Sequence, residues 1–128
     1  MMRLQHIALV CSSENQCDRF YQEVLGLKKM ESKKLPSELS KQIFNIDKEC
    51  KILNYGDHEI RFEIFITEDG CTGYKTMEHI CLEVDDRNLF IQKCSRMNVE
   101  VLQIPRGEFK LVFIKDYDGN LFEVKEIN

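Results

Sequence analysis

The chain has 128 residues, the usual size of one domain, and can bury one ordinary hydrophobic core. Hydrophobic residues make up 43% and charged residues 31%, a balance typical of a folded globular protein and not of a disordered chain. The net charge of −4 argues against nucleic acid as a partner, because phosphate binding needs a concentrated basic surface. No apolar run approaches the roughly 20 residues of a membrane span, so a membrane protein is not expected either.

The six cysteines indicate a reducing compartment. They include no Cys-x-x-Cys pair and do not follow the spacing of small secreted domains. The N-terminal residues predict a strand and not a signal peptide. We therefore expect a cytoplasmic protein with reduced, mostly buried thiols, in which Cys17 and Cys94 lie on the apolar faces of helices.

The first half of the chain predicts a strand, a helix and three further strands. Residues 3–10 alternate as a strand and place His6 on one of its faces. Ser13-Glu14-Asn15-Gln16 is a capping-box pattern that begins a helix, and Gly26 ends it. The apolar stripe of this helix is Cys17, Phe20, Tyr21, Val24 and Leu25. The strands expected after it are 27–33, 51–55 and 59–66.

A short additional helix is expected between the first two of these strands. Pro36 is a favourable first helical residue, and the helix is expected to run to about Phe44. Its spacing predicts that Leu39 and Ile43 face inward.

The second half repeats the same order of elements. Residues 78–84 predict a strand, and Asp85 or Asp86 caps a helix that stops at Asn98. The last three expected strands are 99–104, 110–114 and 120–124, with a turn over 105–108. The loop 68–73 is the natural joint between the halves. The repeat predicts an α+β fold of two βαβββ modules, at about 1–68 and 77–128, within a single domain 1–128.

Four residues of metal-binding type occupy equivalent positions of the two modules: each opens with a His-bearing strand and closes with a Glu-bearing strand. They are His6, Glu63, His79 and Glu123. The period of two along a strand sets the last three opposite clean apolar rows, so they point away from the face that packs on the helices. Two imidazoles and two carboxylates that meet on one sheet face suit a divalent first-row metal ion.

Taken singly, each of these residues has an ordinary structural explanation. A glutamate in a last strand is usually solvated, and a lone histidine in a strand is usually a partly buried polar residue. The symmetry of the repeat favours the metal-ligand interpretation, because all four occur at matching places. The third histidine, His58, falls in a hairpin turn and is expected at the surface.

The same residues resemble the vicinal oxygen chelate superfamily, which includes glyoxalase I, bleomycin-resistance proteins and extradiol dioxygenases. The resemblance covers nearly the whole chain. It is carried by the His6 and His79 strands, by Phe62-Glu63, and by two longer phrases. These phrases are Phe20-Tyr21-Gln22-Glu23-Val24-Leu25-Gly26-Leu27 and Asp116-Tyr117-Asp118-Gly119-Asn120-Leu121-Phe122-Glu123. The resemblance implies the fold known as glyoxalase/bleomycin resistance/dihydroxybiphenyl dioxygenase-like.

Within this superfamily the full set of two His and two Glu is most similar to glyoxalase I. The resemblance implies that all four residues hold a divalent ion: Ni, Zn, Co, Mn or Fe. It implies a metal-dependent lyase or isomerase that moves a proton next to a carbonyl through a metal-bound enediolate. The substrate would be a hemithioacetal of a 2-oxoaldehyde or a similar small carbonyl compound. Glu123 is the first choice as catalytic base and Glu63 the second.

Two positions depart from glutathione-dependent glyoxalase I. Val10 stands where an arginine commonly grips the carboxylate of the thiol cofactor, and Thr67 stands where an asparagine is common. The thiol is therefore left open. So are other superfamily activities, namely an Fe(II) dioxygenase, a thiol transferase, an epimerase or a non-catalytic antibiotic-binding module. By the same resemblance a homodimer that binds a small molecule is expected.

Overall fold

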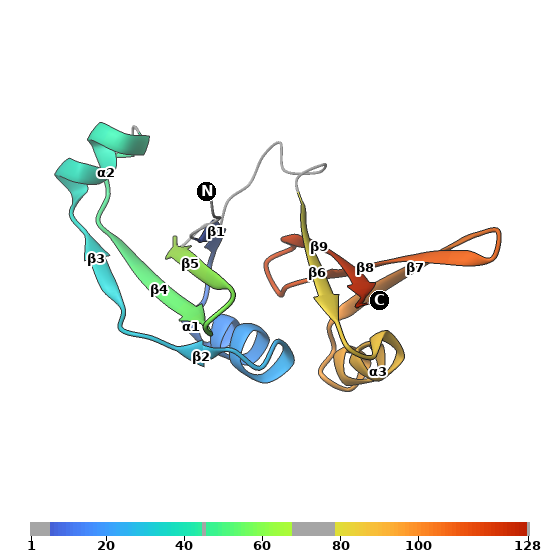
Figure 1. Cartoon of the computed structure of the whole chain (residues 1–128). Coiled ribbons are helices and arrows are strands. Elements are labelled where there is room, and N and C mark those ends of the chain that lie inside the picture. Colours follow the sequence, from blue (N-terminus) through green and yellow to red (C-terminus); the bar gives the residue numbers. More distant parts are fainter. Residues whose placement is uncertain (1–5, 45, 68–78, 128) are drawn as a thin grey trace, which may run out of the picture. The chain divides into compact units, whose positions relative to one another are not determined.

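The computed structural model describes residues 6–44, 46–67 and 79–127, which belong to two compact units that divide between Thr72 and Gly73 (Figure 1). Each unit contains one mixed sheet and at least one helix, so the α+β prediction is confirmed. In both units the first strand runs parallel to the last strand, and the remaining strands follow in antiparallel order. The two βαβββ modules expected from the repeat are therefore present.

The first unit contains eight elements. They are β1 (Ile7–Cys11), α1 (Glu14–Cys17), η1 (Asp18–Val24), β2 (Lys28–Lys29), β3 (Lys33–Leu35), α2 (Ser37–Phe44), β4 (Cys50–Gly56) and β5 (Arg61–Ile66). The sheet order is β1-β5-β4-β2, and β3 also pairs with β4. The single strand predicted over 27–33 was wrong, because two short strands occupy this part of the chain. Between them the Asn54 side-chain amide donates to the Glu31 carbonyl over 3.2 Å, which holds the connecting residues to β4 by a side-chain bond.

The long helix of the first unit packs on β4 and β5. Ser13 caps it as predicted, since its hydroxyl accepts from the Gln16 amide. Its second part, η1, is a π-helix, a wider turn in which the Leu25 amide donates to the Phe20 carbonyl. Tyr21 is fully buried, and its ring centroid lies 5.2 Å from that of Tyr55. Gly26 ends the helix at φ +72°, in the left-handed region, as its position predicted.

Helix α2 differs from its prediction in which face is buried. Leu39, expected to face inward, is 42% exposed, whereas Ser40 is buried at 2%. The Ser40 amide donates to the Pro36 carbonyl over 2.9 Å, so Pro36 precedes the first turn instead of opening the helix. The buried face of α2 therefore includes Ser40 and not Leu39. The Ile43 side chain lies outside the described residues.

The second unit contains five elements. They are β6 (His79–Val84), α3 (Arg87–Arg96), β7 (Glu100–Arg106), β8 (Phe109–Lys115) and β9 (Leu121–Glu126), with sheet order β6-β9-β8-β7. Asp86 caps α3 by accepting from the Leu89 amide, and Asn98 has φ +58°, so both predicted helix ends are confirmed. The turn predicted over 105–108 is shorter, because Arg106 still pairs with Phe109. The predicted joint 68–73 lies outside the described residues.

The described cysteines are free thiols, and four of the five are buried. Burial raises the pKa of the Cys94 thiol to about 11, so this side chain behaves as a small hydrophobe, as does Cys17 at 2% exposure. Cys81 is the exposed one, and Cys71 lies outside the described residues. Within the described ranges no helix is both long and apolar enough to cross a bilayer.

A charged cluster fastens the first helix to the sheet. Glu14 accepts from the ammonium groups of Lys29 in β2 and Lys51 in β4, each over 2.7 Å. Lys29 also lies 2.8 Å from the Asp18 carboxylate, which in turn accepts from the buried Tyr55 hydroxyl. The hydrogen bonds from Lys29 and Lys51 lower the pKa of Glu14 below its ordinary 4.5. The cluster therefore ties three elements together through one carboxylate.

The variant Glu14→Gln is expected to lower the free energy of unfolding at pH 7 by about 1 kcal/mol, the scale of partly exposed ion pairs. Because the folded pKa of Glu14 is depressed, its contribution is present above pH 4.5 and is lost as the pH falls through the folded pKa. Chemical denaturation at a series of pH values measures this. Glu23→Gln, an exposed change on the same helix, is the control and should leave stability within about 0.5 kcal/mol. A Glu14 effect that does not shrink in acid would contradict the assignment.

Candidate metal centre

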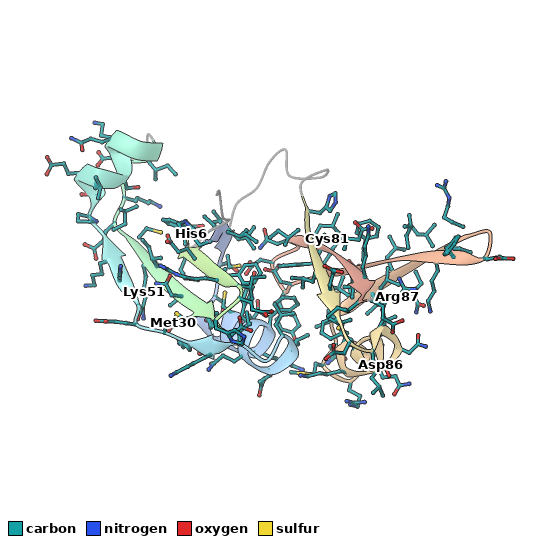
Figure 2. All side chains as sticks on the ribbon, viewed as in Figure 1. His6, Met30, Lys51, Cys81, Asp86 and Arg87 are labelled. Carbon is teal, nitrogen blue, oxygen red and sulfur yellow. The ribbon has the colours of Figure 1, made fainter. Side chains whose placement is uncertain are left out.

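The first His–Glu pair lies on one face of the sheet in the first unit. β1 and β5 pair in parallel with Ala8 opposite Glu63, and His6 immediately precedes β1 (Figure 2). His6 Nε2 lies 3.3 Å from Glu63 Oε2. Phe62 and Ile64, the neighbours of Glu63 along the strand, are fully buried on the opposite face. The alternation predicted from the sequence is therefore present and brings these two donors together.

The second pair occupies the matching place in the second unit. β6 and β9 pair in parallel with Cys81 opposite Glu123, and His79 Nε2 lies 3.9 Å from Glu123 Oε1. Phe122 and Val124 are buried on the other face. The His79 ring packs edge-on against Phe113 of β8, with a centroid distance of 5.9 Å. This aromatic contact orients the imidazole.

These separations fit donors of one ion. A histidine nitrogen and a carboxylate oxygen bound to the same divalent metal at about 2.0–2.2 Å lie roughly 3–4 Å apart, depending on the bond angle. The distances of 3.3 and 3.9 Å fall within that span, and nitrogen plus oxygen donors suit zinc, nickel, cobalt, manganese and iron. The same distances also suit a simple imidazole–carboxylate contact. A metal titration separates these two interpretations.

The surroundings of the two pairs differ. In the first unit Arg61 Nη2 lies 3.4 Å from Glu63 Oε2 and donates to Asn54 Oδ1 over 3.2 Å. In the second unit Cys81 takes the place beside the glutamate. Its thiol pKa is raised, first by burial and then by the negative charge of Glu123. The glutamate of one pair is thus contacted by a cation and that of the other by a neutral thiol.

Sequence reasoning named the four donors but missed Arg61, Asn54, Cys81 and Phe113 as their neighbours. Arg61 and Cys81 could have been found, because each stands two residues from a predicted donor and shares its face. Asn54 and Phe113 depend on strand register, which the sequence does not display. His58 lies at the surface as predicted, with its side chain 88% exposed.

Comparison with known proteins identifies the family. The family model described as Glyoxalase/Bleomycin resistance protein/Dioxygenase superfamily matches residues 3–124. A search of curated protein sequences finds no match.

Several solved structures share the fold. A glyoxalase family protein from Enterococcus faecalis is 20% identical, with a TM-score of 0.75 and 95% of each chain covered. The fosfomycin resistance protein FosX from Listeria monocytogenes is 19% identical, with a TM-score of 0.73 and coverage of 100% of this chain and 95% of that one. A variant of the Listeria protein, solved with Mn(II) and 1S,2S-dihydroxypropylphosphonic acid, is 18% identical with a TM-score of 0.73 and covers 98% of this chain and 92% of that chain. At this identity the likeness concerns the fold.

The variants His6→Ala and His79→Ala are each expected to weaken the binding of Zn(II), Ni(II) or Mn(II) by about 100-fold, because each removes a nitrogen donor from a small ligand set. Isothermal titration with each ion, paired with metal analysis by mass spectrometry, measures the loss. His58→Ala is the matched control and should bind as the parent does. Equal affinity in all three variants would show that these histidines are not ligands.

Proposed function

The chain belongs to the Glyoxalase/Bleomycin resistance protein/Dioxygenase superfamily, and from this premise we propose that it is a metal-dependent lyase or isomerase of the glyoxalase I type. Its substrate would be a hemithioacetal of a 2-oxoaldehyde or a similar small carbonyl compound. One observation carries the proposal: a histidine and a glutamate come within 4 Å of one another at equivalent places of both units. A purely structural role gives no reason for this duplication.

In this proposal His6, Glu63, His79 and Glu123 are the ligands of a divalent ion. When bound, the ion supplies Lewis-acid stabilisation of negative charge that develops on the substrate oxygen. The protein residues would position the hemithioacetal and move a proton from the carbon that carries the sulfur to the neighbouring carbonyl carbon, so that a thioester of a 2-hydroxy acid is formed. Two carboxylates are available for that transfer.

Glu123 is the preferred base. Glu63 Oε2 already accepts a hydrogen bond from the Arg61 guanidinium over 3.4 Å, so this carboxylate has fewer acceptor sites left for a substrate proton. Glu123 instead lies beside the Cys81 thiol and is opposite it in the β6–β9 register. Glu63 would act mainly as a ligand.

A second candidate function follows from the similarity to fosfomycin resistance proteins. The structure of the Listeria protein with Mn(II) and a dihydroxyphosphonate shows a metal and a phosphonate on this fold. The corresponding reaction here would be metal-dependent opening of a phosphonate epoxide by water or a thiol. Arg61 favours this candidate to the extent that it places a cation beside a proposed ligand.

We further propose that the protein acts in the cytoplasm as a homodimer with a small-molecule substrate. The buried free thiols at Cys11, Cys17, Cys50 and Cys94 support a reducing compartment. The acidic balance of the chain, with net charge −4, supports neither a nucleic acid nor a membrane surface as partner.

The activity test uses protein loaded separately with Ni(II), Co(II), Zn(II), Mn(II) and Fe(II), and methylglyoxal with glutathione and other thiols. Glu123→Gln is expected to lower kcat by about 100-fold or more with a smaller change in KM, because it removes the base and keeps the shape. Glu63→Gln is expected to lower metal affinity more than it lowers kcat of the loaded enzyme. Product is followed by mass spectrometry in deuterated water, which also reports proton exchange.

Two results would count against this function. If no thiol and no metal gives product, the glyoxalase-type reaction is excluded, and fosfomycin with water or thiols becomes the deciding substrate. If the parent protein binds none of these ions, the chain is a metal-free binding module. Oxygen consumption that requires Fe(II) would instead identify a dioxygenase.

A further inference from the structure

Arg61 is a charged side chain beside the candidate ligands, and the proposed reaction gives it no contact with the substrate. It lies in β5 two residues before Glu63, so both side chains project from the same sheet face at a spacing of roughly 7 Å between their Cα atoms. Its side chain is 34% exposed, while that of Glu63 is 19% exposed. The guanidinium therefore lies beside the His6–Glu63 pair and is partly open to solvent.

The hydrogen bonds of Arg61 are concentrated on one nitrogen. Nη2 makes both contacts, to Asn54 Oδ1 at 3.2 Å and to Glu63 Oε2 at 3.4 Å. Nε is buried and has no partner among the described residues. Buried donors are nearly always paired, and one that is not calls for an explanation. The guanidinium therefore has hydrogen-bonding capacity that the described protein groups do not use.

Asn54 fixes this arginine in place. It is 3% exposed, its Nδ2 donates to the Glu31 carbonyl over 3.2 Å, and its Oδ1 is thereby left to accept from Arg61. β4 and β5 align Asn54 directly opposite Glu63. The guanidinium is held on its Asn54 side while its Nε–H lacks a partner among the described residues, which is the arrangement of a preorganised donor.

The charge of Arg61 indicates which kind of ligand group it would bind. A bound divalent ion would offset the negative charge of the carboxylates that hold it. Glu63, the carboxylate partner of Arg61 among the described residues, would then be engaged with the ion, which leaves the positive charge of Arg61 to attract an anion. A guanidinium presents parallel N–H groups that match the two oxygens of a planar anion.

We propose that Arg61 is a specificity-determining residue that binds an anionic oxygen group of the substrate, a carboxylate or a phosphonate, beside the metal. This inference rests on the proposed metal function. The alternative is that Arg61 only braces Asn54 and Glu63. Bracing explains the two contacts of Nη2 but does not explain an unpaired Nε on a partly exposed side chain.

The test uses chelating probes that share one metal-binding head. Succinic monohydroxamic acid carries a carboxylate tail, its phosphonate analogue carries a phosphonate tail, and butyrohydroxamic acid carries a neutral tail of similar length. Calorimetry with the Ni(II)-loaded parent is expected to show about 10-fold or tighter binding of an anionic probe than of the neutral one. The stronger of the two anionic probes identifies the group.

Arg61→Gln is expected to abolish this preference while the neutral probe binds within about threefold of the parent value. Arg61→Lys keeps a charge but loses the fork, and is expected to reduce the preference by about threefold or more. If Arg61→Gln does not fold, Arg61→Lys is the variant that tests whether Arg61 causes the preference. Arg96→Gln, at an exposed position of α3, is the control and should keep the full preference. A preference that is absent in the parent, or that persists in both Arg61 variants, overturns the proposal.

A metal-free measurement separates this inference from the proposed function. The Arg61 Nε–H signal in a nitrogen-15 NMR spectrum is expected to shift on titration with succinate or methylphosphonate, but not with neutral butyramide. If the protein takes up no metal, the metal function fails, and this titration still supports or overturns the anion site. If metal binds and the Nε–H signal responds to neither anion, the anion site alone is wrong.

Discussion

The parallel pairing of the first and last strand in each sheet is the constraint on which the candidate site depends. In the first unit it aligns Ala8 with Glu63 and brings His6 to 3.3 Å from that carboxylate. The register is held by the opposite face, where Phe62 and Ile64 are fully buried under the helix. A slip of one residue would expose Phe62 and bury Glu63, at a cost set by lost apolar burial and an unpaired charge. The core therefore enforces the donor geometry.

The two units share one strand arrangement, but the surroundings of their His–Glu pairs differ. A neutral Cys81 and an edge-on Phe113 border the second pair, while Arg61 and a buried Asn54 border the first. Identical donors on equivalent strands can then differ in task, because hydrogen bonds and nearby charge decide what a carboxylate does. Such a difference between the halves would allow the two glutamates to take the separate roles of base and ligand proposed for them. It is absent from the repeat itself and arises from the neighbours.

Local signals in the sequence were sufficient for the ends of helices and for the faces of strands. Ser13, Gly26, Asp86 and Asn98 each act through their own backbone or a residue three positions away, so their roles are readable without the fold. The two His–Glu pairs could be found in the sequence because the repeat duplicates them. The division of the expected 27–33 strand into two could not be predicted, because it involves a hydrogen bond from Asn54, which lies over 20 residues away in the sequence. Leu39 was misassigned because the face that a short helix buries depends on how it packs against the rest of the chain, which spacing alone does not reveal.

Members of this superfamily share one fold, so the choice of substrate must come from the side chains around the site. Structures about 20% identical cover 95–100% of this chain, so the sheets and their order discriminate little between reactions. The positions that differ carry the information. Val10 provides no cation where glutathione-dependent enzymes commonly have one, whereas Arg61 provides a cation two residues from a proposed ligand. In this chain the positive charge therefore lies in β5, beside the His6–Glu63 pair, and not at position 10 of β1. If Arg61 binds the substrate as proposed, this placement would favour a compact substrate whose anionic group lies close to its reacting carbon over a long thiol cofactor whose carboxylates lie far from it.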